Sequence, residues 1–102
     1  MPCVYILRCG DNTFYVGHTS DVDSRLQWHR AGQGARYTAE RLPVDLVYTE
    51  ECSSIDAAVR RERQLKRWSG QKKAALISRH FGQLKRLSKR RRSKKADDGN
   101  AN

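Results

Sequence analysis

Residues 4–17 read VYILRCGDNTFYVG, and this stretch decides the fold. Its two apolar runs are rich in β-branched and aromatic side chains, and the GDNT between them consists of turn-forming residues. Two such runs joined by a short turn predict a β-hairpin. Tyr5 lies in the first run and Tyr15 in the second, with Gly17 close behind.

The rest of the chain predicts one more strand and three helices. Residues 19–30 form an amphipathic pattern with polar N-cap residues before it and glycines after it. A basic, glycine-containing loop at residues 31–43 leads to a third strand at residues 44–50. A long helix at residues 53–68 and a shorter one at residues 71–81 complete the pattern. The order ββαβαα predicts an α+β fold with a small, three-stranded, mainly antiparallel sheet flanked by helices.

The charge of the chain predicts an anionic partner. Among 102 residues, 21 are Lys or Arg and 11 are Asp or Glu, a net charge of +10. Residues 83–95 hold eight of the basic residues and no acid. We therefore expect one folded domain at residues 1–82 and a basic, disordered tail at residues 83–102 that binds polyanions without choosing a sequence.

The cysteines and the apolar pattern predict the cellular compartment of the protein. Cys3, Cys9 and Cys52 are odd in number and lack the spacing of a zinc site, so we expect reduced, half-buried thiols. The sequence shows neither a secretory segment nor a long apolar run. We expect a cytoplasmic or nucleoid-associated protein with no membrane partner and no obvious protein partner.

Polar side chains interrupt the apolar faces of two predicted helices. In the first helix, Arg25 and His29 share a face, and Leu26 places that face at the edge of the core. The apolar stripe of the long helix consists of Ile55, Ala58, Val59, Leu65 and Trp68. Glu62 lies seven residues after Ile55, where the stripe would have an apolar residue. A carboxylate buried there needs a compensating partner. One interpretation is an internal salt bridge between Glu62 and Arg25, with His29 packed at the rim.

The same residues are suited to phosphodiester hydrolysis. A lone glutamate holds Mg²⁺ well, because this ion keeps most of its waters and needs few carboxylates. Arg25 can stabilise charge that develops on a phosphate. A tyrosine can remove a proton from water, provided that nearby positive charge lowers its pKa from the ordinary value of about 10.

Five motifs, in order, resemble the GIY-YIG nuclease family, specifically its small stand-alone members. They are VYI at residues 4–6, YVG at 15–17, SRLQWH at 24–29, GQGARYT at 32–38 and ERQLKRW at 62–68. The resemblance covers roughly residues 3–77. It implies a compact domain with a central three-stranded antiparallel sheet that cleaves nucleic acid with one divalent cation, Mg²⁺ or Mn²⁺. We expect DNA as the substrate, with RNA as an alternative.

The resemblance also implies a set of site residues. The catalytic positions map onto Tyr5, Tyr15, Arg25, His29 and Glu62, with Glu62 as the metal ligand. We expect substrate contacts from Gly17, His18, Arg36, Tyr37 and Lys66. Tyr5 is preferred to Tyr15 as the general base, although the sequence does not separate their roles.

Two departures from the family pattern leave alternatives open. Cys3 stands where the first motif has its leading glycine, and the asparagine that many members carry after the glutamate is absent until Asn100. Gln64, Lys66 and Gln71 are candidates to replace it. The leading prediction is an endonuclease or nickase that acts on branched, nicked or single-stranded DNA. The alternatives are a nucleic-acid-binding protein that does not cleave and a basic component of a ribonucleoprotein.

A shared site for the two tyrosines constrains the hairpin turn. A two-residue loop would place Tyr5 and Tyr15 on opposite faces of the sheet. A three-residue loop at residues 10–12 places Tyr5 opposite Gly17 and Tyr15 opposite Leu7, on one face. We therefore predict an odd-length loop, and we expect Gly17 to leave room for a phosphate.

Overall fold

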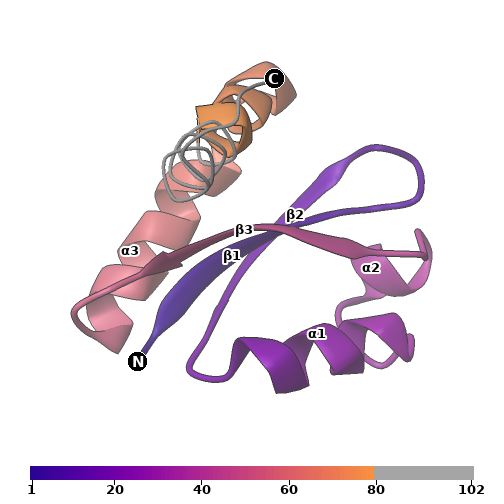
Figure 1. The fold of residues 1–102 in the computed structure, drawn as a ribbon, viewed down its shortest axis with the longest axis horizontal. Helices are drawn as coiled ribbons and strands as arrows, with labels where there is room; N and C mark the ends of the chain where they lie inside the picture. Colours follow the sequence, from indigo (N-terminus) through magenta and orange to yellow (C-terminus); the bar gives the residue numbers. More distant parts are fainter. Residues whose placement is uncertain (80–102) are drawn as a thin grey trace, which may run out of the picture.

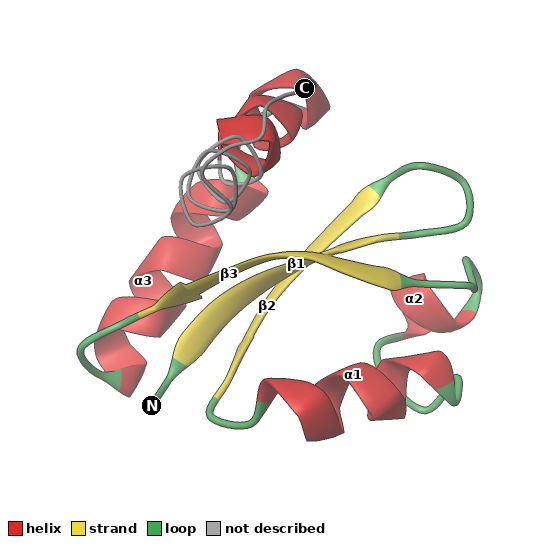
Figure 2. Ribbon diagram, viewed as in Figure 1, coloured by secondary structure: helices red, strands yellow, loops and turns green. Residues whose placement is uncertain are grey.

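The structure, a computed structural model, describes residues 1–79 and has the predicted α+β architecture (Figure 1 and Figure 2). Its antiparallel sheet has the order β2-β1-β3, with β1 at Cys3–Arg8, β2 at Phe14–Thr19 and β3 at Asp45–Glu51. In this sheet β2 pairs with β1 alone, so one side of β2 is a free edge.

The helices cover both faces of the sheet. Figure 1 shows α1 (Val22–Arg30) and α2 (Arg36–Ala39) on one side and α3 (Ile55–Lys66) on the other. Residues 70–79 are also helical, in agreement with the predicted last helix. The predicted loop at residues 31–43 was wrong in one respect, because it contains the single turn α2. The predicted basic tail and the last two positions of the predicted helix lie outside the described residues.

Helices α1 and α3 begin at the polar residues that the sequence indicates. The Asp21 carboxylate accepts a hydrogen bond from the Ser24 backbone N–H at the start of α1. The Ser54 hydroxyl does the same for the Ala57 N–H at the start of α3. Each cap satisfies one of the backbone donors that a helix leaves unpaired at its first turn.

The hairpin has the predicted three-residue loop. Tyr5 pairs with Gly17 and Leu7 with Tyr15, which confirms the predicted register. The Cys9 N–H donates to the Thr13 carbonyl at 2.8 Å and closes the loop. The two tyrosines consequently lie on the same face of the sheet.

Alternation along β1 produces two separate apolar clusters. Val4 and Ile6 face α3 and pack with Ala58 and Leu65. Tyr5 and Leu7 face the other side, where Leu26 of α1 and Val44 cover them. Tyr15 joins this second cluster. His18 is an odd number of residues from Tyr15 along β2, so its side chain lies on the other face of the sheet, which α3 covers.

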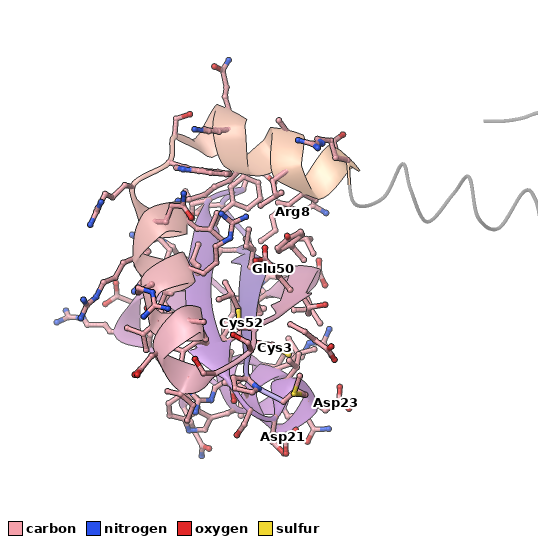
Figure 3. The ribbon with its side chains drawn as sticks, turned by 90° about the vertical axis from the view of Figure 1, so that its left-hand side faces the viewer. Cys3, Arg8, Asp21, Asp23, Glu50 and Cys52 are labelled. Atoms are coloured by element: carbon pink, nitrogen blue, oxygen red, sulfur yellow. The ribbon has the colours of Figure 1, made fainter. Side chains whose placement is uncertain are left out.

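Three expectations about burial were wrong. Ile55 is 61% exposed, because it is the first residue of α3 and the buried positions of that helix begin at Ala58. His29 is buried rather than at the rim, and the Cys9 thiol is buried rather than half-buried. Cys3 and Cys52 are half-buried free thiols, as expected, and Figure 3 shows them at the same end of the sheet.

Candidate active site

Tyr5 and Tyr15 form the floor of the candidate site. Their ring centroids are 6.5 Å apart, and the planes are inclined by 42°. A Cβ added at Gly17 would lie 2.5 Å from the Tyr5 hydroxyl oxygen. The reason expected for this glycine therefore needs correction, because it first makes room for the Tyr5 ring rather than for a phosphate.

A hydrogen-bonded chain runs from Tyr5 into the interior. The Tyr5 hydroxyl lies 3.0 Å from His29 Nε2, and His29 Nδ1 lies 2.8 Å from Thr38 Oγ1. Thr38 Oγ1 in turn donates to the Ala35 carbonyl at 2.9 Å. His29 and Thr38 are both buried, so this chain is shielded from water.

The direction of these hydrogen bonds follows from the single hydroxyl hydrogen of Thr38. Because that hydrogen goes to Ala35, Thr38 Oγ1 accepts from His29 Nδ1–H. Burial, together with the charge of Arg25, lowers the pKa of His29, which favours the neutral imidazole. A neutral imidazole protonated at Nδ1 accepts at Nε2, so the Tyr5 hydroxyl donates to His29.

The acidity of Tyr5 differs from the expectation. Burial and the neighbouring Tyr15 raise the pKa of Tyr5 to about 12, and Arg25 offsets only part of this effect. In the protein alone, the positive charge of Arg25 is therefore not enough to bring the pKa of Tyr5 below its ordinary value. The phenol needs a proton acceptor, and His29 Nε2 is in contact with it.

Glu62 belongs to an ionic cluster on the α3 side of β2. Its Oε1 lies 2.5 Å from His18 Nδ1 and its Oε2 lies 2.8 Å from Lys66 Nζ. The Glu62 side chain is 17% exposed, as its position on the apolar stripe predicted. Burial raises the pKa of Glu62, but the hydrogen bonds from Lys66 and His18 outweigh this effect and lower it overall.

The interpretation of Glu62 as the ion-pair partner of Arg25 was wrong, because Glu62 pairs with His18 and Lys66. The Arg25 guanidinium instead lies over the Trp28 ring, 4.8 Å from its centroid. Arg25 still acts on Tyr5 and His29 through its charge, since it affects the pKa of both.

The two groups of residues meet at the free edge of β2. Lys66 Nζ lies 5.8 Å from the centroid of the Tyr15 ring, which joins the ionic cluster to the tyrosines. Glu62 is also close enough for its charge to raise the pKa of Tyr5. The catalytic positions that the sequence singled out are thus brought together from β1, β2, α1 and α3.

The residues that we expect to contact the substrate do not all lie beside the two tyrosines. Tyr37 stacks on Tyr15 with centroids 6.2 Å apart, which places it beside the site. Arg36 is 89% exposed on its side chain and pairs with Glu40. Lys66 contacts Glu62 directly.

The candidates for the missing asparagine can also be separated. Gln64 accepts a hydrogen bond from Arg61 at 2.8 Å on the exposed side of α3, and Gln71 is exposed. Only Lys66 of the three contacts Glu62 within residues 1–79.

Thr38 is the site residue that sequence reasoning missed. It lies within the quoted motif GQGARYT, but a threonine in a segment without periodicity gives no sign that it is buried. Its contact with His29 spans nine residues and two glycines, and no periodicity in the sequence marks it. A Cβ added at Gly34 would overlap the His29 imidazole, so this glycine allows the segment to pack against the histidine.

The donor set fits a cation bound through one carboxylate. Within residues 1–79, no group of three or more His, Cys, Asp or Glu side chains is placed to hold a metal ion. Each Glu62 oxygen has one partner and keeps lone pairs for a further contact. Mg²⁺ and Mn²⁺ suit such a site, because water and substrate oxygens complete their coordination.

Comparison with known proteins identifies the family. The family model described as the GIY-YIG catalytic domain matches residues 1–75. The chain therefore belongs to the GIY-YIG family and carries a nuclease-type domain.

The similar proteins are UPF0213 proteins. One from Staphylococcus haemolyticus is 49% identical over 74 residues, which are 72% of this chain and 90% of that protein. One from Natronomonas pharaonis is 46% identical over 79 residues, which are 78% of this chain and 93% of that protein. The solution NMR structure of a UPF0213 protein from Bacillus halodurans is 41% identical, with a TM-score of 0.53, and covers 87% of this chain and 96% of its own. It agrees with the α+β fold described above.

Among residues 1–79, no helix is both long and apolar enough to cross a bilayer.

Proposed function

We propose that this protein is a divalent-metal-dependent endonuclease or nickase that hydrolyses phosphodiester bonds in DNA. The observation that carries the proposal is the chain Tyr5–His29–Thr38 beside Glu62 at one sheet edge. The nuclease-type domain and the net charge of +10 support an anionic polymer as the substrate.

In the proposed reaction, Tyr5 takes a proton from the attacking water as it passes its own proton to His29 Nε2. This coupling is necessary because a phenol with a pKa of about 12 is not ionised at neutral pH. Thr38 keeps accepting from His29 Nδ1–H throughout, so the imidazole stays in the orientation that receives the proton. Arg25, whose charge acts on both groups, would also stabilise the negative charge that develops on the phosphate.

Glu62 would hold the cation in this proposal. A bound divalent cation would supply positive charge for the phosphate oxygens and for the leaving oxygen. His18 and Lys66 pair with this carboxylate in the protein alone, so the Lys66 ammonium would turn away as the cation binds. Once their partner carries a cation, these two side chains are available for phosphate oxygens.

A cleavage assay on a panel of labelled DNAs tests this proposal. The panel contains single-stranded, duplex, nicked, flap and forked DNA, each with Mg²⁺ or Mn²⁺. We expect products from at least one substrate and their loss in Glu62→Gln. Glu50→Gln is the matched control, because Glu50 is also a half-buried, ion-paired carboxylate but lies on β3 away from the site. Equal cleavage by the Glu62→Gln variant and the wild-type protein would refute the role of Glu62.

The second candidate is a nucleic-acid-binding protein that does not cleave. It is favoured by one observation, namely that both Glu62 oxygens already have cationic or hydrogen-bonding partners. It predicts DNA binding with a steep dependence on salt and no product with any divalent cation. The panel above separates the two candidates.

A further inference from the structure

A hollow of about 280 Å³ adjoins the candidate active site. It is lined by Phe14, Tyr15, Val16, Tyr37, Lys66 and Lys73. This volume is just below the range of roughly 300–1,000 Å³ that is typical of pockets for drug-sized ligands. Its volume suits one small ligand. Its aromatic and lysine side chains suit a ligand that offers an aromatic ring and a negative charge.

The aromatic wall of the hollow is held in place although it is exposed. Tyr37 is 36% exposed and stacks on Tyr15. The Arg41 guanidinium lies 3.9 Å from the centroid of the Tyr37 ring. Arg41 itself is fixed by an ion pair with Asp11 at 3.1 Å. Because Tyr15 and Arg41 already lie against the ring, Tyr37 is fixed in place and offers a base its remaining exposed surface in the hollow.

The cationic wall provides a charge that the described residues do not neutralise. Lys73 is half-buried, and within residues 1–79 no carboxylate forms an ion pair with it. Lys66 pairs with Glu62. Its ammonium group becomes available to a phosphate when a cation replaces it at that carboxylate. An ammonium group of this kind at the mouth of a hollow favours a phosphate oxygen.

We propose that this hollow binds one unpaired nucleotide of the substrate strand, with its base against Tyr37 and its phosphate on Lys73. This inference rests on the proposed function and names the part of the substrate that enters the hollow. A base within a duplex has both faces covered by its neighbours, so only an unpaired base can turn a face toward Tyr15 and Tyr37. Every base has such a face, so the subsite does not select a sequence.

Binding of a single-stranded DNA hexamer tests this inference. The full chain is titrated, in the presence of a chelator, with fluorescein-labelled dT hexamers in which an abasic site replaces each nucleotide in turn. We expect one position at which loss of the base weakens binding about fivefold or more. Tyr37→Leu should weaken binding of the intact hexamer and remove the sensitivity at that position. Tyr37→Phe is the matched control and should keep it, since it retains the aromatic ring that lines the hollow.

The salt dependence of binding tests the cationic wall. Lys73→Ala should reduce the slope of log affinity against log salt by about 0.7, the value for one phosphate contact with a single strand. Lys72→Ala removes the same charge one residue away, where the ammonium lies over Trp68 at 4.2 Å, and should change the slope less. Sensitivity to the abasic site that is unchanged in Tyr37→Leu, or equal slopes for the two lysine variants, would overturn the inference.

Cleavage and binding separate the two proposals. Dependence on the abasic site without cleavage under any divalent cation would refute the proposed function and leave the subsite standing. Cleavage without this dependence would refute the subsite alone.

Discussion

The two halves of the candidate site differ in how they are held. On the α1 side, Tyr5, His29 and Thr38 form a buried chain of hydrogen bonds between neutral groups. On the α3 side, Glu62, His18 and Lys66 form a partly exposed cluster with formal charges. The first half has a fixed hydrogen-bond direction, whereas the second can exchange partners with a cation or a phosphate. In the proposed reaction, the fold thus separates the groups that transfer the proton from those that bind charged ligands.

Removal of divalent cations should have the largest effect and should act on the α3 side alone. We expect a chelator to abolish cleavage in the assay on labelled DNA. The midpoint of thermal unfolding should not change measurably, because His18 and Lys66 already satisfy the Glu62 carboxylate. Cleavage that persists in the chelator would contradict the account of the α3 half.

Gly17→Ala should disturb the α1 side strongly. The new Cβ would meet Tyr5 Cζ at 2.6 Å, so the ring must move away from its contact with His29. We expect a loss of about 1–3 kcal/mol in the free energy of unfolding and a fall in cleavage rate of about 100-fold. Chemical denaturation and initial rates measure the two effects.

Gly70→Ala is the matched control for that substitution. Nothing lies within 4 Å of a Cβ at Gly70, which is in the last described helix. We expect unchanged cleavage and a gain of about 0.4–1 kcal/mol in stability. If the two glycine variants behave alike, the packing of Tyr5 over Gly17 does not matter for the site.

Thr38→Val tests the hydrogen-bond direction in the buried chain. Valine has a similar shape but leaves His29 Nδ1–H without an acceptor, which should cost about 1–3 kcal/mol of stability. We expect the ¹⁵N spectrum of the His29 imidazole to show a changed tautomer balance and the cleavage rate to fall about tenfold or more. Thr38→Ser keeps the hydroxyl and should restore both. A His29 spectrum that is the same in all three proteins would show that Thr38 does not set the tautomer.

The smallest effect concerns the cap of α1, the helix that carries His29. Hydrogen bonds from Ser24 lower the pKa of Asp21 below the reference value of 3.8. The folded state therefore favours the ionised cap, and its contribution is complete above that value and lost as the pH falls through the lowered pKa. Asp21→Asn should remove this part of the acid dependence of stability, as measured by unfolding between pH 5 and 2. Asp23→Asn is the control, since it removes the neighbouring carboxylate and leaves the cap in place.

The parts of the molecule governed by short-range periodicity could be predicted from the sequence. The turn length followed from the requirement that two tyrosines share a face, and the register of Tyr5 with Gly17 confirmed it. Glu62 was identified because it interrupts an apolar stripe, and it is indeed largely buried. Arg25 and His29 were paired by helical spacing, and both act on Tyr5.

The features that depend on packing between distant segments could not be predicted. Thr38 is buried because α2 folds back on α1, a contact without any repeat in the sequence. The pairing of His18 with Glu62 joins residues 44 positions apart. The raised pKa of Tyr5 results from burial that the hydrophobic pattern of one strand does not reveal.

The cleavage rate of Tyr5→Phe, relative to the wild-type protein, tests the central claim most directly. The substrate is the DNA that the wild-type protein cuts best, and Tyr48→Phe is the control, because Tyr48 is a buried strand tyrosine in the other cluster. If Tyr5 passes a proton from water to His29, the rate should fall roughly 100- to 10,000-fold, while Tyr48→Phe stays near the wild-type rate. A Tyr5→Phe variant that cleaves as fast as Tyr48→Phe would contradict the account.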